Sequence, residues 1–404
     1  MGDFVSQISL DKSTLSNSKL TTTCLIVGIE IIIGLLSGLT FIALGAGGGS
    51  WILGGIAAGA LVFYFYRRYN NQAKPNRNSR KFGQIIVGLT VGFSLKQSNL
   101  ITIYSQLHIF LFLALFLLFC GGIIGYIYSR IEKTDLLTAM LATVPGNIGI
   151  MASIAADYGR NISLVSLVQL IRFTAIIIVI PLVANVSNAH DINAIIHSVT
   201  KNLFVINFNY LFLLFLLLLV TFLAVKIGSY LKIPVAGFLC SIIVGVGFDS
   251  LLDSLPFLSH IDFNLPPLFN LIGQILLGIT IGEYWGMNPK LGKLTVAYAS
   301  VPVAMTFLAG FISAGIATLI SPWDWLTCLL VTSPGGSPEM ILISLALHHN
   351  VEIVTAGHLV RLMTINLCLP ALVSFICYLE RRSTKNQDGA ADQLKTISPK
   401  SAMP

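Results

Sequence analysis

The sequence predicts an all-α polytopic membrane protein made of two inverted repeats, each with about five membrane crossings plus one segment that is re-entrant or broken by Pro-Gly. The first of three observations is composition, since 55% of residues are hydrophobic and only 10% are charged. The second is that long uncharged stretches recur between residues 24 and 379. Several of these stretches are long enough to cross about 30 Å of hydrocarbon as a helix.

The third observation is an internal repeat. Residues 82–92 read FGQIIVGLTVG and residues 272–282 read IGQILLGITIG, with six identities in eleven positions. With one gap, the match continues at four further places: Pro145-Gly146 with Pro334-Gly335, Asn161 with Asn350, Arg172 with Arg361, and Pro181 with Pro370. A repeat of about 190 residues in so apolar a chain is typical of a membrane protein built from two copies of one helical bundle.

Each repeat holds six apolar segments. In the first repeat they cover residues 24–44, 49–66, 82–95, 107–128, 136–156 and 163–184. In the second they cover residues 208–226, 235–252, 268–286, 296–320, 326–347 and 353–379. The expected organisation is a cytoplasmic tail (1–23), membrane repeat 1 (24–184), an extracytoplasmic linker (185–207), membrane repeat 2 (208–380) and a second cytoplasmic tail (381–404).

Loop charges predict that the two repeats face opposite ways. The loop at 67–81 carries six Lys or Arg residues and no acid, so the positive-inside rule places it in the cytoplasm. Its counterpart at 253–267 carries two Asp residues and no Lys or Arg, which places it outside. With six crossings per repeat the second copy would have the same orientation as the first. One segment per repeat therefore fails to cross.

The fifth segment of each repeat is the candidate, because Pro-Gly interrupts it near the middle. It is either a re-entrant helical hairpin or a broken crossing helix, and non-helical backbone at this depth survives only when it is buried or lines a wet cavity. Two half-helix N-termini would then point their free N–H groups at a shared midplane site. The alternative is that Pro-Gly only kinks a packed helix. The residues of the two breaks assigned to this solute site are Pro145, Gly146, Asn147, Pro334, Gly335, Gly336, Ser337 and Glu339.

In the second break, Ser337 is expected to be the N-cap, Pro338 the first helical residue and Glu339 a first-turn acid. Glu339 has Ile150 at the matching position of the first repeat. A lone carboxylate beside an Arg would bind a coupling proton or cation. The alternative is an ordinary first-turn residue of a helix.

Arg172 and Arg361 occupy matched positions in the helices after the breaks, with Gln169 and His358 one turn before them. A guanidinium inside a membrane is costly and faces a partner or a watery cavity. In one interpretation both arginines bind an anionic solute, with Gln169 and His358 as polar lining. In the other, a structural Glu339–Arg361 pair locks the broken segment to its neighbour.

Two further acids lie in apolar segments. Glu30 sits within the first segment and would serve a proton path or lie near a lipid-facing surface. Glu283 ends the ninth segment and is expected at the membrane interface. The matched pairs Gly88/Gly92 and Gly278/Gly282, together with Gly55/Gly59, have the GxxxG spacing that lets helices pack closely.

No residue pattern indicates an enzyme, a cofactor or a metal. The chain lacks a phosphate-binding loop, a dinucleotide fingerprint and a nucleophile elbow, and its six cysteines lie singly in apolar segments. The net charge of +7 comes from short loops and the C-terminal tail, which fits membrane orientation better than nucleic-acid binding. We therefore expect no catalytic residue, no metal ligand and no direct contact with nucleic acid.

The strings TVPGNIGIMA and TSPGGSPEMILISLAL, followed by QLIR and HLVR, resemble the AbrB family of bacterial inner-membrane proteins. The resemblance covers about residues 24–380, and the PGG-x-x-EM signature is intact only in the second copy, because Asn147 and Ile150 replace the second Gly and the Glu in the first. It implies a duplicated unit in the bacterial inner (plasma) membrane, with both termini cytoplasmic in our interpretation. The family also carries labels for regulation of gene expression and for ammonia monooxygenase activity. Regulation could only be indirect here, and these residues do not support the monooxygenase.

The sequence thus leads to one main hypothesis, a secondary transporter or exporter of a small anionic solute that works by alternating access. Its partners would be the solute, a coupling proton or cation, and membrane lipid. The alternatives are a membrane sensor that affects gene expression indirectly and, third, a membrane oxidase. The solute, the coupling ion, the direction of transport and the oligomeric state, including a homo-oligomer, stay open.

Overall fold

The computed structural model describes residues 2–44, 49–70, 73–95, 100–146, 148–184, 208–253, 263, 265–287, 293–347 and 349–397. Within these ranges every regular element is an α-helix. Each of the twelve apolar segments expected from the sequence corresponds to one helix or to a broken pair of helices. The expected linker at 185–207 lies outside the described residues.

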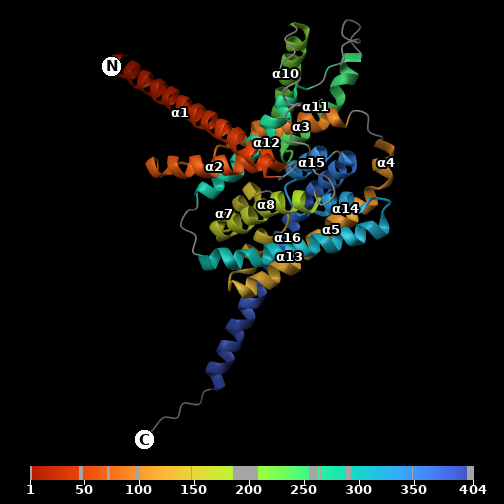
Figure 1. Cartoon of the computed structure of the whole chain (residues 1–404). Helices are drawn as coiled ribbons and strands as arrows, with labels where there is room; N and C mark the ends of the chain where they lie inside the picture. Colours follow the sequence, from red (N-terminus) through yellow and green to blue (C-terminus); the bar gives the residue numbers. More distant parts are fainter. Residues whose placement is uncertain are drawn as a thin grey trace.

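The helices form two groups, which Figure 1 shows in the upper and lower parts of the molecule. The first helix group is α1 (Gly2–Ala43), α2 (Ser50–Tyr69), α3 (Arg77–Ser94), α10 (Phe208–Tyr230), α11 (Ala236–Asp253) and α12 (Pro267–Met287). The second helix group is α5 (Leu107–Ile131), α6 (Leu136–Thr143), α7 (Ile148–Asp157), α8 (Ile162–Ala184), α13 (Lys293–Ile320), α14 (Trp325–Thr332), α15 (Ser337–Ala346) and α16 (Val351–Ile397). Short helix α4 (Leu100–Ser105) lies between them in the chain. Most helix packing is within a group, and α3 against α15 is the main contact between groups.

Membrane-like helices occur in both groups. Seven described helices are long and apolar enough to cross a membrane. They lie at 22–43, 50–69, 107–131, 162–180, 209–230, 294–320 and 351–380. Three further crossings expected from the sequence fall on α3, α11 and α12. Helix α3 begins with basic residues, α12 carries polar ones, and α11 has an apolar stretch at 236–248.

Glycines bring helices of the first group into close contact. A side chain at Gly55 would meet the backbone of α12 at Ile275 and Gly278, and one at Gly59 would meet Ile279. In the same way Gly88 and Gly92 of α3 face the backbone of α11. The GxxxG pairs are therefore packing positions, as expected. The first group is consequently closely packed along α2–α12 and α3–α11.

The two broken segments fold as helical hairpins. Each arm has only eight or ten residues, so the longer arm spans about 15 Å. The base of the first hairpin is closed by an ion pair of 3.3 Å between Asp135 and Arg160, and that of the second by a contact of 2.7 Å between Asp324 and His349. The chain therefore returns to the end at which it entered. Of the two arrangements left open by the sequence, the structure adopts the hairpin.

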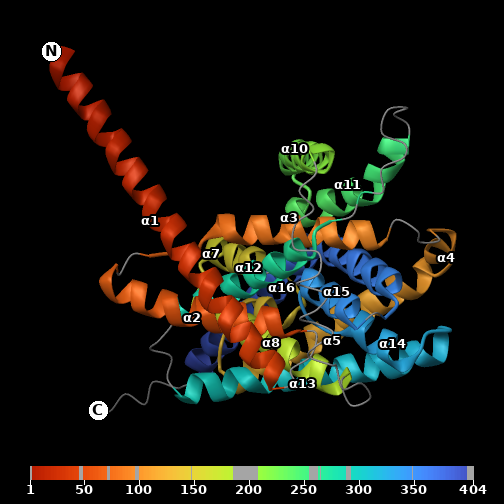
Figure 2. The ribbon, with the colours of Figure 1, turned by 45° about the horizontal axis from the view of Figure 1, so that its top comes forward.

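Both ends of the chain extend the adjoining membrane-like helices. Helix α1 is continuous from Gly2, so the described part of the predicted tail at 1–23 is helical, and α16 continues to Ile397 through most of the predicted tail at 381–404. In Figures 1 and 2 the N-terminal end of α1 projects away from the body of the molecule.

Candidate functional site

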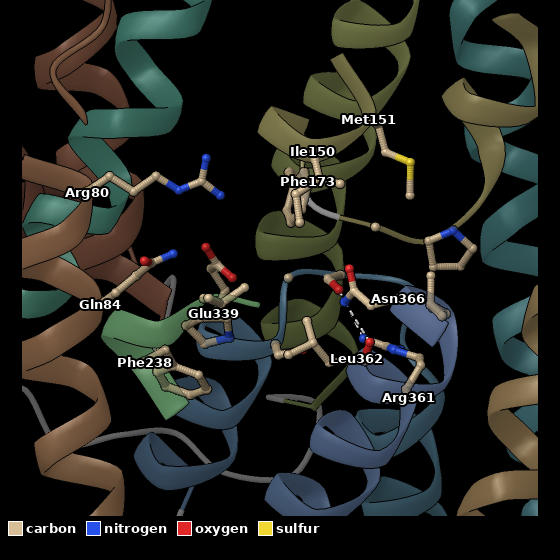
Figure 3. A pocket seen from close by; sticks show the side chains of 18 residues that line it. Arg80, Gln84, Ile150, Met151, Phe173, Phe238, Glu339, Arg361, Leu362 and Asn366 are labelled. Carbon is tan, nitrogen blue, oxygen red and sulfur yellow. Dashed lines mark hydrogen bonds between the residues drawn. The ribbon is translucent and has the colours of Figure 1, made fainter. Parts of the chain in front are cut away.

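A cavity of about 60 Å³ lies between the two helix groups (Figure 3). This volume suffices for a few water molecules or a small solute. The first group contributes residues of α3 and α11, and the second group contributes both hairpin breaks, α7, α8, α15 and α16. The residues that line the cavity are Arg80, Gln84, Pro145, Gly146, Ile150, Met151, Phe173, Val235, Phe238, Gly335, Gly336, Ser337, Pro338, Glu339, Arg361, Leu362, Ile365 and Asn366.

The lining joins the two Pro-Gly breaks, which lie far apart in the sequence. Seven of the site residues expected from the sequence are in it: Pro145, Gly146, Gly335, Gly336, Ser337, Glu339 and Arg361. Pro334, Gln169, Arg172 and His358 are not part of the lining. Asn147 lies outside the described residues. The structure therefore brings most of the expected break residues together around the cavity. Gln169 and His358, which precede the two arginines, lie outside the cavity lining.

The second break ends at the N-terminus of α15. Its N-cap is Gly336 rather than Ser337, because helical geometry already begins at Ser337, and Pro338 and Glu339 follow in the first turn. A first turn has backbone N–H groups without partners inside the helix and carries a partial positive charge. This helix end therefore offers the cavity a favourable surface for an anion.

Arg361 of α16 holds the backbone of the second break in place. Its guanidinium donates to the carbonyl oxygens of Ser333 at 2.6 Å and Gly335 at 3.0 Å. It also donates to Nδ1 of His358 at 2.7 Å, so Nε2 of His358 carries a proton and donates to the carbonyl of Leu330 at 2.9 Å. Arg361 and His358 thus satisfy carbonyl groups that the end of α14 leaves without helical partners.

Arg172 of α8 holds the backbone of the first break in place in the same manner. Its guanidinium donates to the carbonyl of Thr143 at 2.9 Å and to the side-chain oxygen of Gln169 at 2.5 Å. The amide of Gln169 donates to the carbonyl of Leu141 at 2.9 Å. Both Gln169 and Arg172 are at most 1% exposed. The sequence led us to expect that Gln169, Arg172 and His358 line the cavity. In the structure they instead support the backbone at the two breaks.

Glu339 is the carboxylate of the cavity. It is 8% exposed, and its Oε2 has no hydrogen-bond partner. No ion pair joins it to Arg361, both of which are described, because the guanidinium of Arg361 is directed at backbone carbonyls. Glu339 instead interacts electrostatically with Arg80 of α3, whose guanidinium Figure 3 shows near the carboxyl of Glu339. The structural Glu339–Arg361 pair considered from the sequence is therefore absent.

Three polar lining residues were not identified from the sequence as site residues: Arg80, Gln84 and Asn366. Arg80 counted only as a cytoplasmic loop charge. Gln84 belongs to the repeated FGQ and IGQ strings, so the repeat itself was a signal for it. Asn366 interrupts an apolar segment one turn and a half beyond Arg361, and its amide donates to the carbonyl of Leu362 at 2.7 Å. Among the described residues no group of three His, Cys, Asp or Glu is placed to hold a metal ion.

Comparisons with known proteins give one family model and two relatives at modest identity. The family model described as "Transition state regulatory protein AbrB" matches residues 51–377. The uncharacterized protein YhjN of Bacillus subtilis (strain 168) is 27% identical over 375 residues, which cover 87% of this chain and 97% of that protein. The "Putative regulator AbrB" of Escherichia coli (strain K12) is 26% identical over 311 residues, which cover 74% of this chain and 83% of that protein. No solved structure matches.

Proposed function

The chain belongs to the AbrB family, and from this premise we propose that it is a multi-pass membrane protein that transports a small anionic solute by alternating access. The observation that carries the proposal is the cavity at the boundary between the two helix groups, lined by both hairpin breaks. A solute held at such a boundary is exposed to one side or the other when one group moves against the other. The sparse packing between the groups favours this movement.

The charge around the cavity favours an anion. Arg80 enters from the first group, and Arg361 and the N-terminus of α15 enter from the second. The carboxylate of Glu339 contributes negative charge to the same cavity. In the proposal Arg80 and the first turn of α15 bind the solute. Arg361, with His358, holds the second break in place, as Arg172 and Gln169 hold the first, so these are positioning residues.

Glu339 is the proposed coupling group. Its carboxylate and an anionic solute would compete for the positive charge of Arg80, because both are negative and both lie in the same small cavity. Protonation of Glu339 removes one of the two negative charges and favours solute binding. The proton is therefore the proposed coupling ion.

The inverted repeat is part of the same proposal. A hairpin that returns to its starting side leaves five crossings per repeat, and an odd number inverts the second repeat relative to the first. The hydrogen bonds of Arg172 and Gln169 recur at the matched Arg361 and His358, which supports a duplicated unit. The basic loop at 67–81 and the C-terminal tail then face the cytoplasm, in a bacterial inner membrane.

Thermal unfolding of the purified protein tests the solute site. The probes are small mono- and dicarboxylates, inorganic phosphate and nucleobases, each at two pH values. One class of anion is expected to raise the Tm of the wild type and of Arg130→Gln, which removes an exposed arginine of α5 outside the cavity lining. The same anion is expected to have no effect on Arg80→Gln. Equal stabilisation of Arg80→Gln contradicts the site assignment.

A second candidate function is a membrane sensor that changes gene expression. It is favoured by the description of the family model and by the name of the Escherichia coli relative. This hypothesis predicts that deletion of residues 381–404, or removal of the basic charges of 67–81 other than Arg80 of the cavity lining, abolishes the regulatory effect and leaves solute binding intact. If the whole probe panel fails to stabilise folded protein, the sensor becomes the better hypothesis.

A further inference from the structure

A second polar site lies inside the first helix group, outside the solute cavity. Glu30 of α1 has no exposed surface, and neither of its carboxyl oxygens has a hydrogen-bond partner. The sequence left open whether this residue lies near lipid. The structure turns it toward protein, because Glu30, Gly34, Gly38 and Ile42 form one face of α1 whose residues are all buried.

Close helix packing seals this face. A side chain at Gly34 would lie 2.8 Å from Ile275 of α12, and one at Gly54 of α2 would lie 2.5 Å from the backbone of Gly34. One turn further along α1, the hydroxyl of Ser37 donates to the carbonyl of Gly54 at 3.1 Å. Helices α1, α2 and α12 therefore meet without room for lipid, and Glu30 lies one turn before this junction.

The second carboxyl of the site is Glu283 of α12. It is 2% exposed, because α12 packs against both α2 and α3. The position at the membrane interface expected from the sequence stays a prediction. Its Oε2 accepts a hydrogen bond of 2.6 Å from the backbone N–H of Asn76. Glu30 and Glu283 interact electrostatically with each other.

No cation offsets the two acids among the described residues that act on them. Arg67, at the end of α2, donates to the carbonyl of Met287 instead. Two ionised carboxylates buried together without a counter-charge are costly, and one proton relieves both the burial and the repulsion. Glu283 has a backbone N–H that stabilises its ionised form, whereas Glu30 has no donor.

We propose that Glu30 and Glu283 form a buried proton-binding site in the first helix group, in which Glu30 carries the proton and Glu283 is the neighbouring carboxylate. The site touches the start of α3, since Asn76 is the N-cap of that helix and accepts from the N–H groups of Asn78 and Ser79. Arg80, which lines the solute cavity, follows in the first turn. Loss of the proton places a second negative charge near Glu283, the carboxylate that accepts from the N-cap residue of α3. The proposal does not depend on the solute or on transport.

Infrared spectroscopy of the purified protein tests the proton directly. A protonated carboxyl has a C=O stretching band that is separate from the bands of ionised carboxylates and that shifts in D₂O. At neutral pH this band is expected in the wild type and in Glu339→Gln, which removes the acid of the solute cavity. In the Glu339→Gln background it is expected to be lost on the further change Glu30→Gln and retained on Glu283→Gln. The control Glu352→Gln, at the start of α16, leaves it unchanged.

Absence of the band in folded Glu339→Gln protein overturns the proposal, as does its persistence when Glu30→Gln is added to that variant. Thermal unfolding against pH gives a second readout. A carboxyl that stays protonated in the fold but ionises in the unfolded chain makes the Tm fall as pH rises. This fall is expected to be smaller in Glu30→Gln than in the wild type and in Glu352→Gln. Equal slopes in all three proteins would likewise contradict a proton on Glu30.

Discussion

The α6–α7 hairpin and the α14–α15 hairpin have the same supporting contacts but present different side chains to the cavity. Each hairpin begins at an Asp N-cap that binds the Thr three residues later, and each break is held by a buried arginine on backbone carbonyls. The first hairpin presents Ile150 where the second presents Glu339. Both hairpins therefore have the supporting contacts, while only the second has the titratable group.

The largest effect is expected from the two arginines that hold the breaks. Arg172→Ala and Arg361→Ala each leave buried carbonyls without donors, which costs about 3 kcal/mol or more in the free energy of unfolding. Because the supporting contacts are the same, the two losses should be similar. Denaturant unfolding in detergent measures them. If one arginine can be removed without loss, the supporting contacts are not equivalent.

Glycine substitutions at the breaks should destabilise the two hairpins to different extents. A side chain at Gly336 would lie 2.6 Å from the ring of Phe173 and would also meet the carboxyl of Glu339, so Gly336→Ala is expected to cost about 1–3 kcal/mol. At Gly146 a side chain meets the flexible end of Met151, which can move, so Gly146→Ala should cost less. Thermal unfolding of both variants checks the order. A larger loss for Gly146→Ala would contradict it.

The missing carboxylate of the first hairpin offers a test of the chemistry. Ile150→Glu places a second acid in the cavity lining and should weaken anion binding on the order of tenfold, or about 1.4 kcal/mol. Glu339→Gln should make anion binding independent of pH where Glu339 titrates. Isothermal titration with the anion found by the thermal screen measures both. Ile150→Gln controls for size and should bind more tightly than Ile150→Glu, and equal affinities would place the anion elsewhere.

The smallest effect is expected at the hairpin base. Partial burial raises the pKa of Asp324, but hydrogen bonds from Thr327 and His349 outweigh it and hold the pKa below its ordinary value. A lowered pKa contributes stability that is present above the pKa of the unfolded chain, about 3.9, and is lost as pH falls through the folded value. Asp324→Asn should therefore flatten the acid side of a plot of Tm against pH. An unchanged acid limb would show that this carboxyl contributes nothing.

The sequence predicted the elements well because apolar runs and Pro-Gly interruptions are local signals. The hairpin breaks at Pro145 and Pro334 and their meeting in one cavity followed from such signals. The hydrogen-bond acceptors of Arg172 and Arg361 could not be predicted, because they are backbone carbonyls, which every residue has. Arg80 was missed because its partner Glu339 belongs to the other helix group, more than 250 residues away. The environment of Glu30 could not be predicted, because the sequence of a uniformly apolar helix does not show which face packs on protein.

Accessibility of Ser337 tests the central claim most directly. Ser337 lines the cavity, and Ser337→Cys changes its size little. The variant would be placed in oriented membranes, with the six native cysteines replaced. A membrane-impermeant maleimide would then be added from one side at a time, with and without the stabilising anion. Alternating access predicts labelling from both sides, in proportions that the anion changes. Labelling from one side only, whatever anion or pH is used, would contradict it.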